Sequence, residues 1–258
     1  MHTTVDFALD LEGRGSLGVK IKAQPQLDRQ DPFIATRSYV NELLSRLGPV
    51  IGSLIFDVAS FEACGAGGVG FMRSSVAMTK RKIPVVLDLS RASISGRRAL
   101  EDFPGTAIVN FQARSSDDTE ELLLAAKRTR GAVFLGLQQG NLSPSLAERD
   151  RFSNTIINPW ILHNISDTAI RFREGKWSRV GVALPACSPE DILEISSLLP
   201  FSPILLTDIS PDSAVRANGL VAVISDPHLD VGRRRQIKSA IRYGHWLALR
   251  SKPLTLAR

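Results

Sequence analysis

The stretch VVLDLSRASISG (residues 85–96) begins as an uninterrupted apolar run and ends as a polar loop. The apolar half has the composition of a strand that is covered on both faces, as in parallel sheets. The loop opens with one carboxylate, Asp88, and continues with the hydroxyl groups of Ser90 and Ser93 and the guanidinium of Arg91. The stretch therefore predicts a buried strand that ends in a group of candidate functional side chains.

Short apolar runs of this kind recur along the whole chain and predict its fold. Eight are found, at residues 5–11, 53–59, 83–90, 106–112, 131–138, 179–186, 202–209 and 220–226. Helical patterns lie among them at residues 33–48, 115–131, 152–172, 188–199 and 232–251, the third of them interrupted by Pro159. Eight strands that alternate with helices predict a (β/α)₈ TIM barrel of class α/β. The length of 258 residues suits one barrel domain spanning residues 1–258, and a doubly wound open sheet is the alternative.

The composition excludes several classes of protein. No apolar run approaches the roughly 20 residues that span a bilayer, and residues 1–13 lack the pattern of a secretory signal, so we expect a cytoplasmic protein without membrane contact. The formal net charge is +6. The basic residues are scattered along the chain, except for two clusters at 79–82 and 232–238, and aromatic residues make up only 6% of the sequence. This pattern does not favour a nucleic-acid partner.

Cys64 and Cys187 have no metal-ligand spacing, so neither a metal site nor a disulfide is expected.

The glycines of CGAGGVG (residues 64–70) fall in a G-x-G-x-x-G frame. A dinucleotide fingerprint opens the first βα unit, whereas this frame belongs to the second, and no acid is placed clearly for a ribose. We therefore expect no nicotinamide or flavin, and no other cofactor. The glycines are expected instead to let a helix start approach a neighbouring loop or subunit.

Polar side chains stand at the predicted carboxyl ends of the strands, where barrel enzymes build their active sites. Asp57 and Asp88 each follow apolar residues directly, and a carboxylate in such surroundings needs a partner or a raised pKa. His228 follows the last strand and is a candidate general acid or base. For each position alone, the alternative is a polar residue placed where a strand reaches solvent. The full set also contains Asp10, Ser90, Asn110, Gln112, Gln138, Gln139, Asn141, Asp208 and Asp226.

Several segments, in order, resemble bacterial orotidine 5'-monophosphate decarboxylases. They are DVASFEACGAGGVGFM (57–72), VVLDLSRASISG (85–96), AIVNFQARSSDD (107–118), GAVFLGLQQGNLSPS (131–145) and VGVALPACSPEDILEI (180–195). The similarity covers most of residues 50–210. It implies a ribulose-phosphate-binding-barrel-like fold and a homodimer.

The resemblance also implies where the chemistry would lie. The third strand of the family carries the pattern Asp-x-Lys-x-x-Asp, in which the lysine is the proton donor and the second aspartate is supplied across the dimer interface. Here Asp88 matches the first aspartate, Ser90 the lysine and Ser93 the second aspartate, while the second-strand lysine falls at Ile55. A serine carries no charge and is no acid at neutral pH, so decarboxylation by the family mechanism is not expected.

Other features bear on the same question. Lys20, Lys22 and Arg91 are cations that could approach from another direction, although a guanidinium is a poor proton donor. The regions that would bind phosphate in the family, 205–214 and 222–230, hold carboxylates, which repel a phosphate.

Two functions remain open. The first is a repurposed enzyme that uses acid/base or electrostatic catalysis on a small organic substrate of specialised metabolism, in a cyclisation, isomerisation, elimination or decarboxylation. The second is a non-catalytic protein that binds a ligand or a partner. The candidate catalytic residues are Asp57, Asp88, Ser90, Ser93 and His228. The candidate substrate-binding residues are Asp10, Arg91, Asn110, Gln112, Gln138, Gln139, Asn141 and Asp208.

Overall fold

The structure is a computed structural model. It describes residues 17–23, 25, 30–47, 51–110, 116–136, 159–174, 177–184, 195, 197–199, 202–206 and 220–225. The strand expected at 5–11 and the helix expected at 232–251 lie outside this part, as does most of the helix expected at 188–199.

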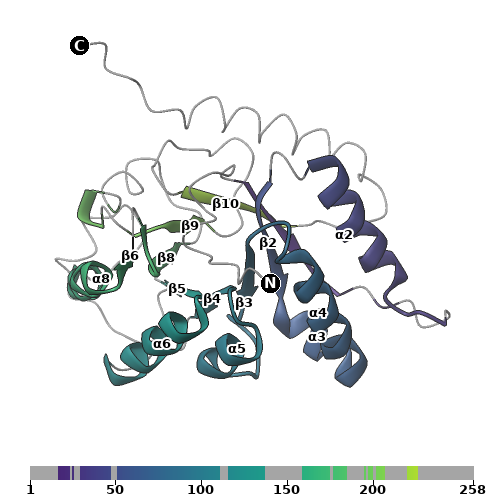
Figure 1. Cartoon of the computed structure of the whole chain (residues 1–258), viewed down its shortest axis with the longest axis horizontal. Helices are drawn as coiled ribbons and strands as arrows, with labels where there is room; N and C mark the ends of the chain where they lie inside the picture. The colour runs from purple at the N-terminus through teal and green to yellow at the C-terminus, as the bar shows by residue number, and fades with distance from the viewer. Residues whose placement is uncertain are drawn as a thin grey trace, which may run out of the picture.

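Eight parallel strands form a closed barrel in the order β1-β10-β9-β8-β5-β4-β3-β2 (Figure 1). They are β1 (Leu17–Ile21), β2 (Ile51–Asp57), β3 (Val85–Asp88), β4 (Ala107–Asn110), β5 (Ala132–Gly136), β8 (Val180–Leu184), β9 (Ile204–Leu206) and β10 (Leu220–Ser225). A separate two-stranded antiparallel ribbon, β6 (Arg173–Glu174) and β7 (Trp177–Ser178), lies before β8. The predicted (β/α)₈ barrel is confirmed.

The first barrel strand differs from the prediction. β1 (Leu17–Ile21) pairs with β2 on one side and with β10 on the other, so it closes the barrel. It is the first strand of the barrel, the position that was predicted for residues 5–11. Its sequence LGVKI contains a glycine and a lysine that interrupt the apolar run, so its composition does not predict a strand. The other seven predicted strands are confirmed.

The described helices lie on the outside of the barrel (Figure 1). They are α2 (Ile34–Leu47), α3 (Val58–Glu62), α4 (Gly65–Thr79), α5 (Gly96–Asp102), α6 (Ser116–Thr129) and α8 (Pro159–Arg171). The predicted helices at 33–48 and 115–131 are confirmed as α2 and α6. Within the predicted segment 152–172, Pro159 is the first residue of α8, a position that suits proline because its missing N–H would have no partner in the first turn.

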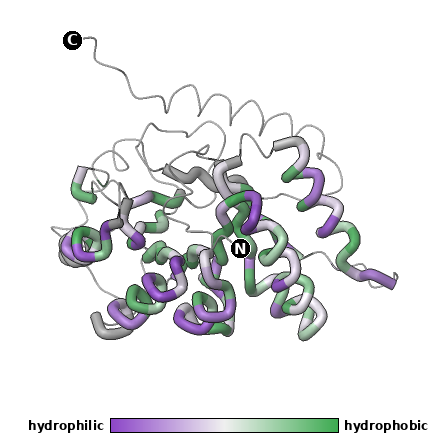
Figure 2. Tube along the Cα trace, in the orientation of Figure 1, coloured by the Kyte–Doolittle hydropathy of each residue, from purple (hydrophilic) through white to green (hydrophobic). Residues whose placement is uncertain are grey.

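Alternate side chains of the strands face two different apolar regions. One set packs between the sheet and the helices, as Leu54 and Phe56 do on β2. The other set fills the interior of the barrel: Ile55, Val86, Ala107, Val109, Ala132, Phe134, Ala183 and Leu205. Figure 2 shows the strands as largely hydrophobic, whereas the helices carry both hydrophobic and hydrophilic segments. The alternation identifies which strand residues point into the barrel.

The glycines of the G-x-G-x-x-G frame belong to α4, which begins at Gly65. A dinucleotide fingerprint would place them in a loop between a strand and a helix, so the local structure differs from that motif. At Gly68, a Cβ atom would collide with the backbone carbonyl oxygen of Phe61 and with the side chain of Cys64. This glycine lets the end of α3 pack directly against α4.

Candidate active site

Two carboxylates enter the barrel mouth side by side. Asp57 and Asp88 are the last residues of β2 and β3 and are partners in the register of the two strands. They stand two residues after Ile55 and Val86, which face the barrel interior, so the alternation directs both carboxylates inward. Asp57 is 4% exposed and Asp88 is 6% exposed. Two buried acids at adjacent positions repel each other when both are ionised, and nearby cations relieve this repulsion.

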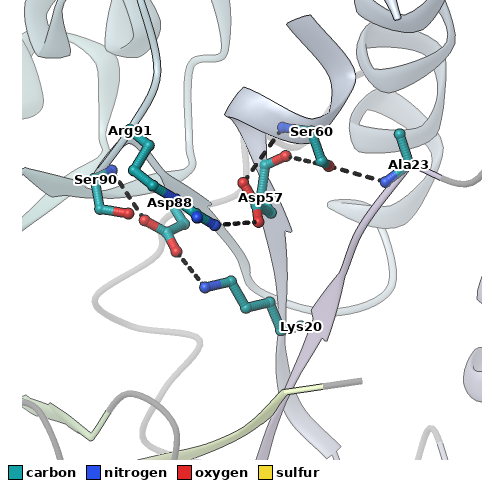
Figure 3. Close-up of polar contacts among 7 residues, drawn as sticks. All are labelled: Lys20, Ala23, Asp57, Ser60, Asp88, Ser90 and Arg91. Atoms are coloured by element: carbon teal, nitrogen blue, oxygen red, sulfur yellow. Dashed lines mark hydrogen bonds and ion pairs between the residues drawn. The ribbon is translucent and has the colours of Figure 1, made fainter. Parts of the chain in front are cut away.

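Lys20 supplies one of these cations. Its Nζ lies 2.7 Å from Asp88 Oδ2, and the two side chains are 10% and 7% exposed (Figure 3). In the ladder of β1 and β2, Lys20 is the partner of Ile55 rather than of Asp57. Its backbone therefore lies one layer deeper than the two carboxylates, and its long side chain extends past β2 to reach Asp88 on β3. The barrel thus holds a buried ion pair between its first and third strands.

The surroundings of Asp88 keep it ionised. Burial by itself raises the pKa of this carboxyl, but the hydrogen bond and charge of Lys20, together with hydrogen bonds from Ser90, outweigh it and lower the pKa below the ordinary 3.8. The Ser90 N–H donates to Asp88 Oδ1 at 3.0 Å. Asp88 is thus a carboxylate at neutral pH.

Asp57 is held by two groups. Its Oδ1 accepts a hydrogen bond from the Ser60 N–H at 3.4 Å and so caps the start of α3. Its Oδ2 lies 3.4 Å from Arg91 Nη2 (Figure 3). The Arg91 side chain is 71% exposed, so it bridges the buried acid and the surface of the barrel mouth.

The loop after β3 is fixed by Glu62, a residue that the sequence analysis did not select. Its carboxylate accepts hydrogen bonds from the Ser93 N–H at 2.7 Å, the Ser93 hydroxyl at 2.9 Å and the Ile94 N–H at 3.2 Å. Ser93 is therefore bound to Glu62 at the end of α3. In the sequence, Glu62 stands out only as part of the segment 57–72 that resembles the decarboxylases.

Asn110 lies apart from the two carboxylates. Its neighbour Val109 is the register partner of Asp88 and faces the interior, so Asn110 faces the helices. A Cβ atom at Gly96, the first residue of α5, would lie 3.3 Å from Asn110 Nδ2.

The structure thus brings together Asp57, Asp88, Ser90 and Arg91, and leaves Asn110 and Ser93 outside this group. The remaining polar residues predicted at strand ends lie outside the described residues: Asp10, Gln112, Gln138, Gln139, Asn141, Asp208, Asp226 and His228.

Lys20 completes the group. It is one of the three cations that the sequence identified as able to approach from another direction; Lys22 follows β1 and is half-buried. The sequence signal for Lys20 is a lysine within a short and otherwise largely apolar segment, LGVKI, which is typical of a strand with one polar inward-facing position. The segment is too short and too interrupted for its composition alone to indicate a strand.

Two further properties of the described residues concern membranes and metals. No helix in this part of the chain is both long and apolar enough to cross a bilayer. Nor do these residues gather three or more His, Cys, Asp or Glu side chains in one place that could hold a metal ion.

Comparison with known proteins finds similarity only at the level of structure. No family model matches the sequence, and no curated protein matches it significantly. The OMP decarboxylase of Leishmania donovani superposes with a TM-score of 0.67 at 18% identity, over 95% of this chain and 97% of that one. A putative orotidine 5'-phosphate decarboxylase from Streptomyces avermitilis gives 0.65 at 16% identity, over 95% and 94%. The UMP synthase of L. donovani gives 0.70 at 18% identity, over 98% of this chain and 58% of that one. The chain therefore has the (β/α)₈ barrel fold of the orotidine monophosphate decarboxylases.

Proposed function

We propose that the protein is an enzyme that stabilises negative charge on a carbon atom of a small organic substrate, with the Lys20 ammonium as the cation and proton donor. The observation that carries the proposal is the 2.7 Å contact between Lys20 Nζ and Asp88 Oδ2 inside the barrel mouth. A buried ion pair is often no more stable than apolar residues of the same size, so its retention at the active-site end of a barrel favours a functional role.

The position of Lys20 supports this role. The resemblance placed the second-strand lysine of the decarboxylases at Ile55, and Lys20 is the register partner of Ile55 on the adjacent strand. It also placed the third-strand lysine at Ser90. The Ser90 N–H donates to one oxygen of the Asp88 carboxylate, and Lys20 pairs with the other. We infer that β1 supplies the ammonium group that neither β2 nor β3 offers.

The chemistry follows from an ammonium group that is buried and held in a fixed position. Such a group stabilises charge that develops on a carbon atom more strongly than water does, because it needs no reorientation during the reaction. Asp88 holds the ammonium group in place through the 2.7 Å contact. In a decarboxylation, the bond to the carboxylate carbon breaks, carbon dioxide leaves, and the electron pair that stays on carbon takes the proton of Lys20. Lys20 then recovers a proton from solvent.

Arg91 is the proposed residue for an anionic group of the substrate. Its guanidinium is largely exposed and contacts Asp57 at the long distance of 3.4 Å, so a substrate anion can compete for it. The proposal also includes a small-molecule ligand and a homodimer, as the sequence predicts.

The test uses orotidine monophosphate and a panel of small organic carboxylates in D₂O, with carbon dioxide release and deuterium incorporation as the readouts. We expect turnover by the wild-type protein and a loss of about 10²-fold or more in Lys20→Met, which has neither charge nor proton to give. Lys20→Arg keeps the charge and should recover little proton transfer. Lys82→Met, the same change at an exposed position, is the control and should leave turnover unchanged.

Two outcomes would oppose the proposal. Turnover that survives Lys20→Met within about twofold would remove Lys20 from the chemistry, because a general acid contributes roughly 10²-fold or more. A bound small molecule recovered chemically unchanged, with no turnover of the panel, would favour the non-catalytic alternative.

A further inference from the structure

Ser60 joins the ends of β1 and β2 at the barrel mouth (Figure 3). Its hydroxyl accepts a hydrogen bond from the Ala23 N–H at 2.9 Å and donates one to the Asp57 carbonyl oxygen at 2.7 Å. Its own N–H donates to Asp57 Oδ1. One half-buried side chain thus connects the segment that leaves β1 to the last residue of β2.

We propose that Ser60 is a positioning residue that holds Lys20 against Asp88. The proposal rests on the proposed function in taking the Lys20–Asp88 pair as the reactive group. β1 has five residues, and its ladder with β2 ends at the pair Ile21 and Phe56. The bond to Ala23 lies two residues beyond this pair, so it extends the attachment of the strand that carries Lys20.

The register of β1 explains why this attachment matters. The pairing of β1 with β2 shifts between Leu17 and Gly18, so the entrance of the strand is irregular. A slip of one residue would turn Lys20 out of the barrel and bring an apolar neighbour, Val19 or Ile21, into the mouth. Val19 and Ile21 belong to the core between sheet and helices and resist this slip, and the hydroxyl of Ser60 fixes the strand at its exit.

The two roles of Ser60 can be separated. The cap of α3 depends on the Ser60 N–H and the Asp57 carboxylate, which a change of side chain leaves in place. The attachment of Ala23 depends on the hydroxyl alone. Ser60→Ala therefore removes the attachment and retains the helix cap.

The experiment compares full-length wild type, Ser60→Ala, Ser60→Cys and the control Ser45→Ala. The Ser45 hydroxyl donates to the Glu42 carbonyl oxygen at 3.0 Å, with the same three-residue spacing as in Ser60 and Asp57, but on the exposed face of α2. Two quantities are measured by NMR: the pKa of the Asp88 carboxyl and the hydrogen-exchange rate of the Ala23 amide.

In Ser60→Ala we expect the pKa of Asp88 to rise by about one unit, as a carboxyl does when its cation withdraws, and Ala23 to exchange faster. Ser60→Cys, whose thiol is a weak acceptor, should shift both quantities less and in the same direction. Ser45→Ala should change neither.

An unchanged pKa of Asp88 in folded Ser60→Ala would overturn the proposal, even if the melting temperature fell, because loss of stability alone does not separate Lys20 from Asp88. If Ser60→Ala does not fold, an unchanged pKa in Ser60→Cys overturns it equally. The measurement requires no substrate, so its result is independent of whether turnover is found.

Discussion

Lys20 and Asp88 carry opposite charges inside the barrel, and neither charge is stable there without the other. We expect Lys20→Met and Asp88→Asn each to lower the free energy of unfolding by about 3 kcal/mol, because each leaves a buried charge without its ion-pair partner. The double variant should lose clearly less than the sum of the two, because it removes both charges. Urea denaturation of the four proteins gives this double-mutant cycle.

The exposed pair of Arg97 and Glu101 provides the comparison. These side chains are 54% and 38% exposed and lie 3.1 Å apart on α5. Solvent screens such pairs, so we expect a coupling of at most about 0.5 kcal/mol in the same cycle. Equal coupling in the two pairs would contradict the assignment of Lys20 and Asp88 as a buried pair.

Helices α3 and α4 meet through one glycine, and this contact sets the direction of the chain after β2. Gly68→Ala would place a Cβ atom against the Phe61 carbonyl oxygen and the Cys64 side chain, so we expect a loss of about 2 kcal/mol or more through overpacking. Gly70→Ala in the same helix meets nothing within 4 Å and should stabilise the protein by about 0.5–1 kcal/mol, since alanine favours a helix over glycine. Melting temperatures of the two variants test this. A similar change in both would show that helix propensity, rather than the contact, decides the effect.

The stability of the whole barrel should depend on the ionisation of Asp88. Its pKa in the folded protein lies below the ordinary 3.8, because Lys20 and Ser90 outweigh the effect of burial. The folded state therefore binds this proton more weakly than the unfolded chain does. The stability from Asp88 is complete above the unfolded pKa and is lost as the pH falls through the folded pKa.

We therefore expect the free energy of unfolding of the wild-type protein to decrease as the pH is lowered from 5 to 3, a range set by the pKa of roughly 3.9 of an unperturbed aspartate. The decrease should be smaller in Asp88→Asn and in Lys20→Met. Urea midpoints at the two pH values measure the difference. An equal fall in wild type and in Asp88→Asn would show that other carboxyl groups govern the acid sensitivity.

The sequence by itself determined the class of fold and part of the site. Seven of the eight strands were predicted, because strands buried on both faces consist of apolar runs that are visible without tertiary information. Asp57 and Asp88 were identified by their position at the ends of such runs. In the same way, α2 and α6 follow from apolar periodicity, whereas α3 and α5 are too short to show one.

Tertiary structure alone decided which groups surround the carboxylates. Parallel pairing places β1 beside β2 and β2 beside β3, and this brings Lys20 to Asp88 although the two are far apart in the sequence. The alternation of a strand directs Asn110 toward α5, and the end of α3 brings Glu62 to Ser93. The physical reason is that apolar burial depends on local sequence pattern, whereas the partner of a buried charge depends on strand order and register, which are set only when the strands pair in the folded sheet.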